Sequence, residues 1–185
     1  SYPLAYGQVN CGGIFMSSAG TGGVAPVVPY SATVSNNTIS IVNNGAAATS
    51  GIDFGYGLTT SNQIANNNTI SIETGSSVAN SSIHQGIKSQ YNSALNELIG
   101  NNISISQSGT GTYSAGVYFI NANGRKVNLT VQNNFLQSIN SHIKTTNIVY
   151  AISHNGGVSS GLVIGGSPST SNTINVQRSA PSSNF

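Results

Sequence analysis

The chain has 185 residues, of which 4% are charged, and its five basic and three acidic side chains leave a formal net charge of +2. A chain of this length favours one domain with a sizeable core. Scattered Lys and Arg residues cannot supply the dense positive charge that binds nucleic acids and anionic membranes. We therefore predict no nucleic-acid partner and, since no apolar run reaches about 18 residues, no membrane insertion.

Asn, Ser, Thr and Gly supply most of the polarity, and Ile and Val alternate with them along the chain. This regular placement of β-branched residues predicts an ordered protein. The single cysteine, Cys11, excludes an internal disulfide. We expect a small buried residue there, with a cross-chain disulfide as the alternative. The sequence begins at Ser1 without Met, which favours a processed, exported product.

One short motif recurs along the chain, an Asn pair followed by alternating apolar and polar residues. It occupies residues 35–41 and 66–72, returns at 100–105, and is echoed more loosely at 132–136 and 171–176. The closing Asn residues stand about 31, 34, 32 and 38 residues apart, and they are Asn37, Asn68, Asn102, Asn134 and Asn172. Periods in this range are typical of solenoid proteins.

Two further elements keep the same period. A small residue followed by apolar ones recurs at residues 51–54, 86–88, 116–119 and 151–153, and a third strand pattern precedes the Asn motif at 63–64, 98–99 and 127–131. Three short strands per period describe one coil of a parallel β-helix. We predict an all-β, single-domain solenoid of about five coils over residues 31–178, with an N-terminal cap or first partial coil at 1–30 and a C-terminal tail at 179–185.

Alternation within the strands predicts which side chains face the core. In a strand of period two, Ile39 and Ile41 point one way while Thr38 and Ser40 point the other. Successive coils then stack the inward residues into apolar columns, for which we select Ile39, Ile41, Ile70, Ile72, Ile103, Ile105, Ile52, Ile87, Val117 and Ile152. The repeated Asn residues at the corners are predicted to form a hydrogen-bonded ladder between coils, which explains them without a ligand.

One segment departs from the repeat. Residues 89–99 place Tyr91, Leu95, Leu98 and Ile99 at spacings near three and four, with good helix formers between them. This pattern predicts either a short helical excursion or a loop that leads into the strand at Leu98 and Ile99.

The strings at residues 34–41 and 62–72 resemble right-handed parallel β-helix repeats. Such repeats occur in bacterial surface proteins, autotransporter passengers, phage tailspikes and carbohydrate-active enzymes. The resemblance covers residues 34–176. It implies the fold and its right hand, whereas the architecture hosts many functions.

Carbohydrate-active chemistry is the first to test against the residues. Glycoside hydrolysis needs two carboxylates on either side of the scissile bond, and the acidic residues are only Asp53, Glu73 and Glu97, which are dispersed along the chain. We predict that the protein is not an enzyme and has no catalytic residue, cofactor or metal site. Asp53 instead falls one period before Lys88, so the two are predicted to form an exposed inter-coil ion pair worth about 0.2–1 kcal/mol.

The histidines offer no local metal motif. His84, His142 and His154 are far apart in the sequence, and His84 is predicted at an ordinary surface or corner position.

The functional prediction follows from these exclusions. We expect an extracellular or cell-surface structural protein that associates with itself, end to end, as a filament or matrix subunit, or that acts as a surface adhesin. Tyr2, Tyr6 and Tyr30 are candidate anchors for a neighbouring copy. The alternatives are a module that binds surface glycans and a carbohydrate-active lyase or hydrolase.

Overall fold

The computed structural model describes residues 10–16, 31–55, 60–89, 92–138 and 143–179. These residues form strands and turns only, so the described part of the chain contains no helix that could span a membrane. Tyr2, Tyr6, Tyr30 and His142, together with residues 180–185 of the predicted tail, lie outside the described residues.

The described residues contain fifteen strands, which form three parallel sheets of five strands each. Sheet A runs in the order β1 (Asn10–Met16), β4 (Ala48–Phe54), β7 (His84–Lys88), β10 (Val117–Asn121) and β13 (Val149–Ser153). Sheet B contains β2 (Ser31–Ser35), β5 (Asn62–Asn66), β8 (Ser93–Ile99), β11 (Lys126–Gln132) and β14 (Val158–Ile164). Sheet C contains β3 (Thr38–Asn43), β6 (Thr69–Thr74), β9 (Asn102–Gln107), β12 (Phe135–Ser138) and β15 (Thr173–Asn175).

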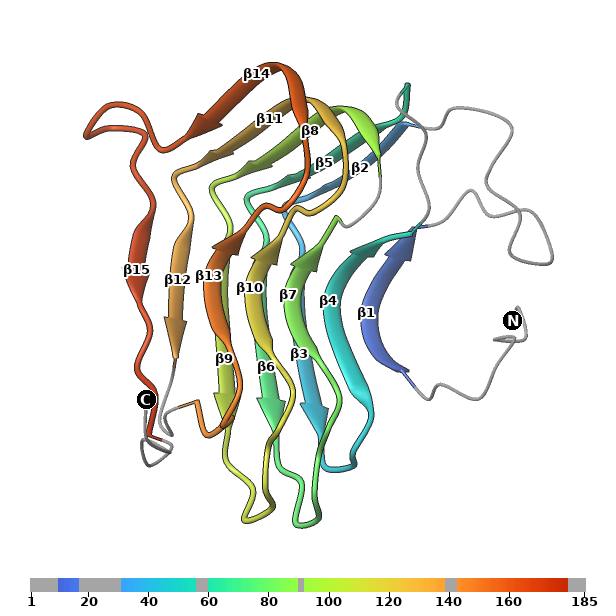
Figure 1. Ribbon diagram of the computed structural model, residues 1–185, viewed down its shortest axis with the longest axis vertical. Coiled ribbons are helices and arrows are strands. Elements are labelled where there is room, and N and C mark those ends of the chain that lie inside the picture. Colours follow the sequence, from blue (N-terminus) through green and yellow to red (C-terminus); the bar gives the residue numbers. More distant parts are fainter. Residues whose placement is uncertain (1–9, 17–30, 56–59, 90–91, 139–142, 180–185) are drawn as a thin grey trace, which may run out of the picture.

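The chain visits sheets A, B and C in turn and then begins again, as Figure 1 shows. Each strand pairs in parallel with the equivalent strand of the neighbouring coils, on both sides for β4–β12 and on one side for the strands of the two end coils, so the fold is a parallel β-solenoid of about four turns. The predicted fold class is therefore confirmed. We number the coils from one (β1–β3) to five (β13–β15).

Sheet C carries the clearest apolar columns. The register places Ile39, Ile70, Ile103 and Leu136 side by side in successive coils, and each is at most 8% exposed. A second column contains Ile41, Ile72 and Ile105. At about 1.5–3 kcal/mol for each fully buried Ile or Leu, such columns are a main source of stability.

Sheet A follows the same logic with one change of register. Ile52 and Ile87 stack as predicted, but the next member of the column is Ile120, followed by the partly buried Ile152. Val117 is buried in a different column, so its predicted stacking with Ile52 and Ile87 is wrong. The error arises because the loop before β10 shifts the Gly116–Val117 pair three residues ahead of the true equivalent.

Glycine in the middle of the sheet A strands permits a close approach of two sheets. Gly51 and Ile52 are both buried, which breaks the in–out alternation of β4. A Cβ atom on Gly51 would lie 2.5 Å from the Cγ2 of Ile70 and 2.6 Å from the carbonyl oxygen of Gly86. A side chain at this position therefore has no room.

The corner between sheets B and C repeats one backbone device. Asn36, Asn67 and Asn133 have φ angles of 60°, 56° and 55°, and Gly100 takes the same left-handed conformation at 69°. Asn and Gly tolerate this region best. The residues that follow these four form an amide ladder, which Asn172 after Ser171 completes in the fifth coil, so its members are Asn37, Asn68, Asn101, Asn134 and Asn172.

The predicted ladder is thus correct except in the third coil. Asn101 is 1% exposed and bonds to Asn68 and Asn134, whereas Asn102 is exposed and begins β9 opposite Thr69. Gly100 replaces the first Asn of the pair, so the pair of Asn residues in this coil stands one position later in the chain.

Two further predictions, the helical excursion and the buried position of Cys11, are revised. Residues 93–99 form β8 and not a helix, because pairing with β5 and β11 on both sides outweighs the helical spacing of Leu95 and Leu98. Tyr91 lies outside the described residues. Within the predicted N-terminal cap or partial coil, β1 pairs with β4 as a regular member of sheet A, and its Cys11 is a free thiol of intermediate exposure.

Candidate functional site: the exposed C-terminal coil

The predicted inter-coil ion pair is present. Lys88 Nζ donates to Asp53 Oδ2 at 2.9 Å, and the two residues stand opposite each other in β7 and β4. The side chains are only 20% and 13% exposed, so the pair is more buried than we expected. Desolvation by burial raises the pKa of Asp53, although the charge of Lys88 acts to lower it. The pair joins coils two and three, and burial limits what it offers to a ligand.

The three carboxylates lie on three different sheets. Asp53 belongs to sheet A, Glu73 to sheet C and Glu97 to sheet B, which confirms that they are dispersed. A glycosidase requires two carboxyl groups about 5–10 Å apart around one bond. Among the residues that the structure describes, no three His, Cys, Asp or Glu side chains gather in a way that could hold a metal ion.

His84 is buried, so its predicted surface or corner position is wrong. It is 1% exposed and packs edge-on to Tyr113 with ring centroids 6.4 Å apart. Neither ring nitrogen has a hydrogen-bond partner in the described part of the chain, and desolvation lowers the pKa of His84 to about 4. Its column contains Thr49 and Val117 in the neighbouring coils, and this column faces the core. His154 is partly buried and contacts the carbonyl oxygen of Ala122 at 2.9 Å.

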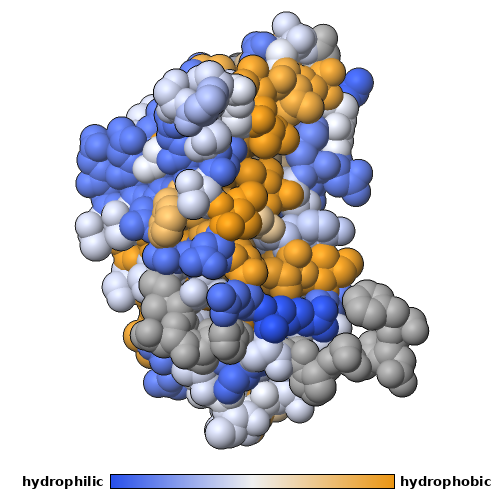
Figure 2. Space-filling view, turned by 90° about the vertical axis from the view of Figure 1, so that its left-hand side faces the viewer, coloured by the Kyte–Doolittle hydropathy of each residue, from blue (hydrophilic) through white to orange (hydrophobic). Residues whose placement is uncertain are grey.

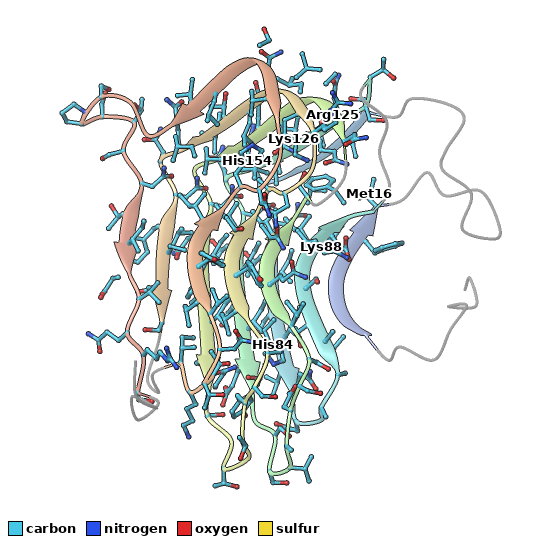
Figure 3. All side chains as sticks on the ribbon, in the orientation of Figure 1. Met16, His84, Lys88, Arg125, Lys126 and His154 are labelled. Atoms are coloured by element: carbon cyan, nitrogen blue, oxygen red, sulfur yellow. The ribbon has the colours of Figure 1, made fainter. Side chains whose placement is uncertain are left out.

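A buried polar cluster, which we define as Gln63, Ser89, Ser93, Asn96 and Lys126, had no counterpart in the sequence predictions. Lys126 Nζ donates to the carbonyl oxygen of Ser89 at 2.8 Å and to its hydroxyl oxygen at 3.1 Å. Desolvation lowers the pKa of Lys126 to about 7. All five residues are at most 1% exposed, so the cluster is closed to external ligands. Figure 3 shows Lys126 well separated from His84.

The fifth coil exposes side chains that are core residues elsewhere. Leu162, Ile164 and Ile174 are 52%, 47% and 54% exposed. Their register equivalents in the fourth coil are 1%, 0% and 0% exposed, and they are Leu129, Val131 and Leu136. Figure 2 shows this end of the molecule, where an apolar stripe runs between two polar margins. Within the described structure, the interior of the solenoid is therefore exposed at the C-terminal coil.

The same coil carries unpaired backbone. β13, β14 and β15 each stand last in their sheets and pair with one strand only, so their outer edges have no strand partner among the described residues. At the opposite end β1, β2 and β3 likewise have one partner each. Unpaired edges that lie beside exposed apolar side chains are a template for another chain.

Three parallel sheets wound in register, with an asparagine ladder at one corner, place the protein in the class of parallel β-solenoids. The sequence matches no protein-family model, and comparisons with curated proteins and with solved structures give no significant match. The functional argument therefore depends on the residues of this chain, and the exposed C-terminal coil is the strongest candidate site.

Proposed function

We propose that this protein is a non-enzymatic, extracellular structural subunit that associates with copies of itself end to end, as part of a filament or matrix or as a surface adhesin. One observation carries the proposal: Leu162, Ile164 and Ile174 face solvent at the C-terminal coil, whereas their equivalents one coil earlier are buried. Exposed core residues of this kind mark an interaction surface.

The energetic gain from covering this surface is appreciable. Each of the three side chains is about half exposed, and completing the burial of each contributes about half of the 1.5–3 kcal/mol of a full Leu or Ile. The sum is about 2–5 kcal/mol before strand pairing and the costs of association are counted. A formal net charge of +2 provides little repulsion between copies.

The extracellular location is supported by composition and by resemblance. The strings at residues 34–41 and 62–72 resemble the right-handed β-helix repeats that occur in bacterial surface proteins and autotransporter passengers, and 4% charged residues with much Asn, Ser and Thr are compatible with such a role. A solenoid end that contacts the opposite end of the next copy generates an open array, because such contacts do not close on themselves.

A second candidate function is glycan binding. Tyr118 and Tyr150 are neighbours in sheet A, with ring centroids 5.5 Å apart, and Tyr150 is 41% exposed. Aromatic faces with polar tips are suitable contacts for ligands that are part apolar and part polar. A glycan array tests this candidate directly, and a Tyr150→Ala variant that retains full glycan binding would contradict it.

Assembly is tested by negative-stain electron microscopy and sedimentation velocity over a concentration series. We expect fibres one solenoid wide, with a meridional spacing of about 4.8 Å. The double variant Leu162→Lys and Ile174→Lys should need at least about tenfold more protein to assemble, which corresponds to about 1.4 kcal/mol. The matched control, Val78→Lys and Ile83→Lys, changes two exposed apolar residues away from the ends and should assemble normally. Monomers at every concentration, or discrete trimers, would overturn the proposal.

A further inference from the structure

The asparagine ladder has a fixed direction. In each step the backbone N–H and the Nδ2 of one Asn both donate to the Oδ1 of the Asn in the next coil. The distances are 3.0 and 3.0 Å from Asn37 to Asn68, and 3.1 and 3.0 Å from Asn68 to Asn101. They are 2.9 and 3.0 Å from Asn101 to Asn134, and 3.0 and 2.9 Å from Asn134 to Asn172.

This direction makes the two ends of the ladder complementary. Asn172 accepts from Asn134, and within the described residues its backbone N–H has no acceptor. Its Nδ2 donates only to the carbonyl oxygen of Val131, which leaves one N–H of the amide free to continue the ladder. Asn37 donates to Asn68, and its Oδ1 accepts no hydrogen bond from the part of the chain that the structure describes. One end thus presents donors and the other presents an acceptor.

The strands of sheet C continue this complementarity. The column of paired residues that begins at Thr38 in the first coil ends at Thr173 in the fifth coil. The neighbouring column begins at Ile39 and ends at the exposed Ile174. If β3 of a second copy followed β15, each column would gain one more member with the same in–out pattern.

We propose that copies of this chain join head to tail in a single register, with the asparagine ladder passing through the joint from Asn172 of one copy to Asn37 of the next. This inference rests on the proposed self-association and adds its polarity and alignment. A joint between two like ends would oppose donors with donors or acceptors with acceptors, and buried polar groups without partners are costly.

Paired cysteines test the joint. In a Cys11→Ser background, Thr38→Cys and Thr173→Cys place thiols on adjacent strands of neighbouring copies, about 4.8 Å apart at Cα, which is within the range of a disulfide. Both residues are exposed, so the changes spare the core. Mild oxidation should give a series of disulfide-linked multimers on a non-reducing gel. Ser40→Cys with Asn175→Cys is a second pair in the same register and should behave alike.

The control and the outcomes separate this inference from the proposed function. Thr38→Cys with Asn175→Cys is two residues out of register, at about 8 Å, and should yield few multimers because thiols so far apart cannot be bridged. Equal multimer yields from this control would overturn the register. Disulfide dimers from Thr173→Cys alone would show like-end contacts and overturn the polarity, while self-association would stand. Fibres that form without cross-links from either in-register pair would also overturn the inference. Absence of any assembly would overturn the proposed function itself.

Discussion

Replacing Asn101 with Ala should destabilise the fold far more than replacing its neighbour Asn102. The Asn101 side chain donates to the carbonyl oxygen of Ala65 at 2.8 Å and to Asn134 Oδ1 at 3.0 Å, and it accepts from the backbone N–H of Asn68 at 3.1 Å. Alanine leaves the buried Ala65 carbonyl and the Asn68 N–H without these bonds. At about 1–3 kcal/mol for each orphaned group, we expect a loss of about 2–6 kcal/mol.

The assay is equilibrium unfolding in urea at protein concentrations below those that support assembly. The free energy of unfolding of Asn101→Ala and Asn102→Ala is compared with that of the wild type at an unchanged slope. Asn102 is exposed, so its substitution should change the free energy by less than about 0.5 kcal/mol. Equal effects of the two substitutions, or an effect below about 1 kcal/mol at Asn101, would refute the argument that the ladder stabilises the coils.

Three further predictions concern buried groups. Between pH 6.5 and about 4 the unfolded chain binds a proton at His84 that the folded chain excludes, so the free energy of unfolding should fall by about 3 kcal/mol as the pH is lowered. In urea titrations His84→Leu should remove this dependence of stability on pH, and His154→Gln should keep it. Between pH 10.5 and about 7 the unfolded chain binds a proton at Lys126 that the folded chain excludes, so the free energy of unfolding should fall by about 5 kcal/mol as the pH is lowered. A Lys126→Met variant whose stability keeps the full dependence on pH in this range would contradict this assignment. Gly51→Ala should cost about 1–3 kcal/mol through overpacking, measured as a lower unfolding midpoint, whereas Gly157→Ala, where a Cβ meets nothing within 4 Å, should be close to neutral.

The parts of the fold that could be predicted are those where neighbouring coils repeat both residue type and spacing. The strings around Ile39, Ile70 and Ile103 are nearly identical, so their register follows from alignment alone. The pairing of Asp53 with Lys88 follows from the same period. Both predictions use only the fact that a strand one coil later repeats the environment of the strand before it.

The errors arise where neighbouring coils do not repeat the same residue type at the same register position. Gly100 takes the left-handed position that Asn36 and Asn67 occupy, so counting from the Asn pair misplaced the ladder residue at Asn102. Gly116 was aligned with the glycines of the sheet A strands, so the prediction placed Val117 in the column of Ile87, which belongs to Ile120. At Gly100 neighbouring coils share the backbone conformation and not the residue identity, whereas at Gly116 the residue identity recurs out of register, because Phe119 stands opposite Gly86.

The candidate site could not be predicted because exposure depends on what lies beyond a strand. Leu162 and Ile164 read as ordinary inward residues, and they are exposed only because no further coil covers them in the described structure. The burial of His84 and Lys126 was equally hidden, since a polar residue in an inward column has the same local sequence as one that faces solvent.

The left-handed corner and the directional ladder together make the length of this molecule adjustable only in whole coils. Removal of residues 69–101 would join Asn68 to Asn102, which occupies the position of Thr69, and the rod would shorten by about 4.8 Å with its parallel strand pairing and its ladder continued. Loss of a single residue within a strand instead turns its inward side chains outward. Duplication of one coil is therefore an easy route to a longer protein, whereas small insertions and deletions are confined to the loops between strands.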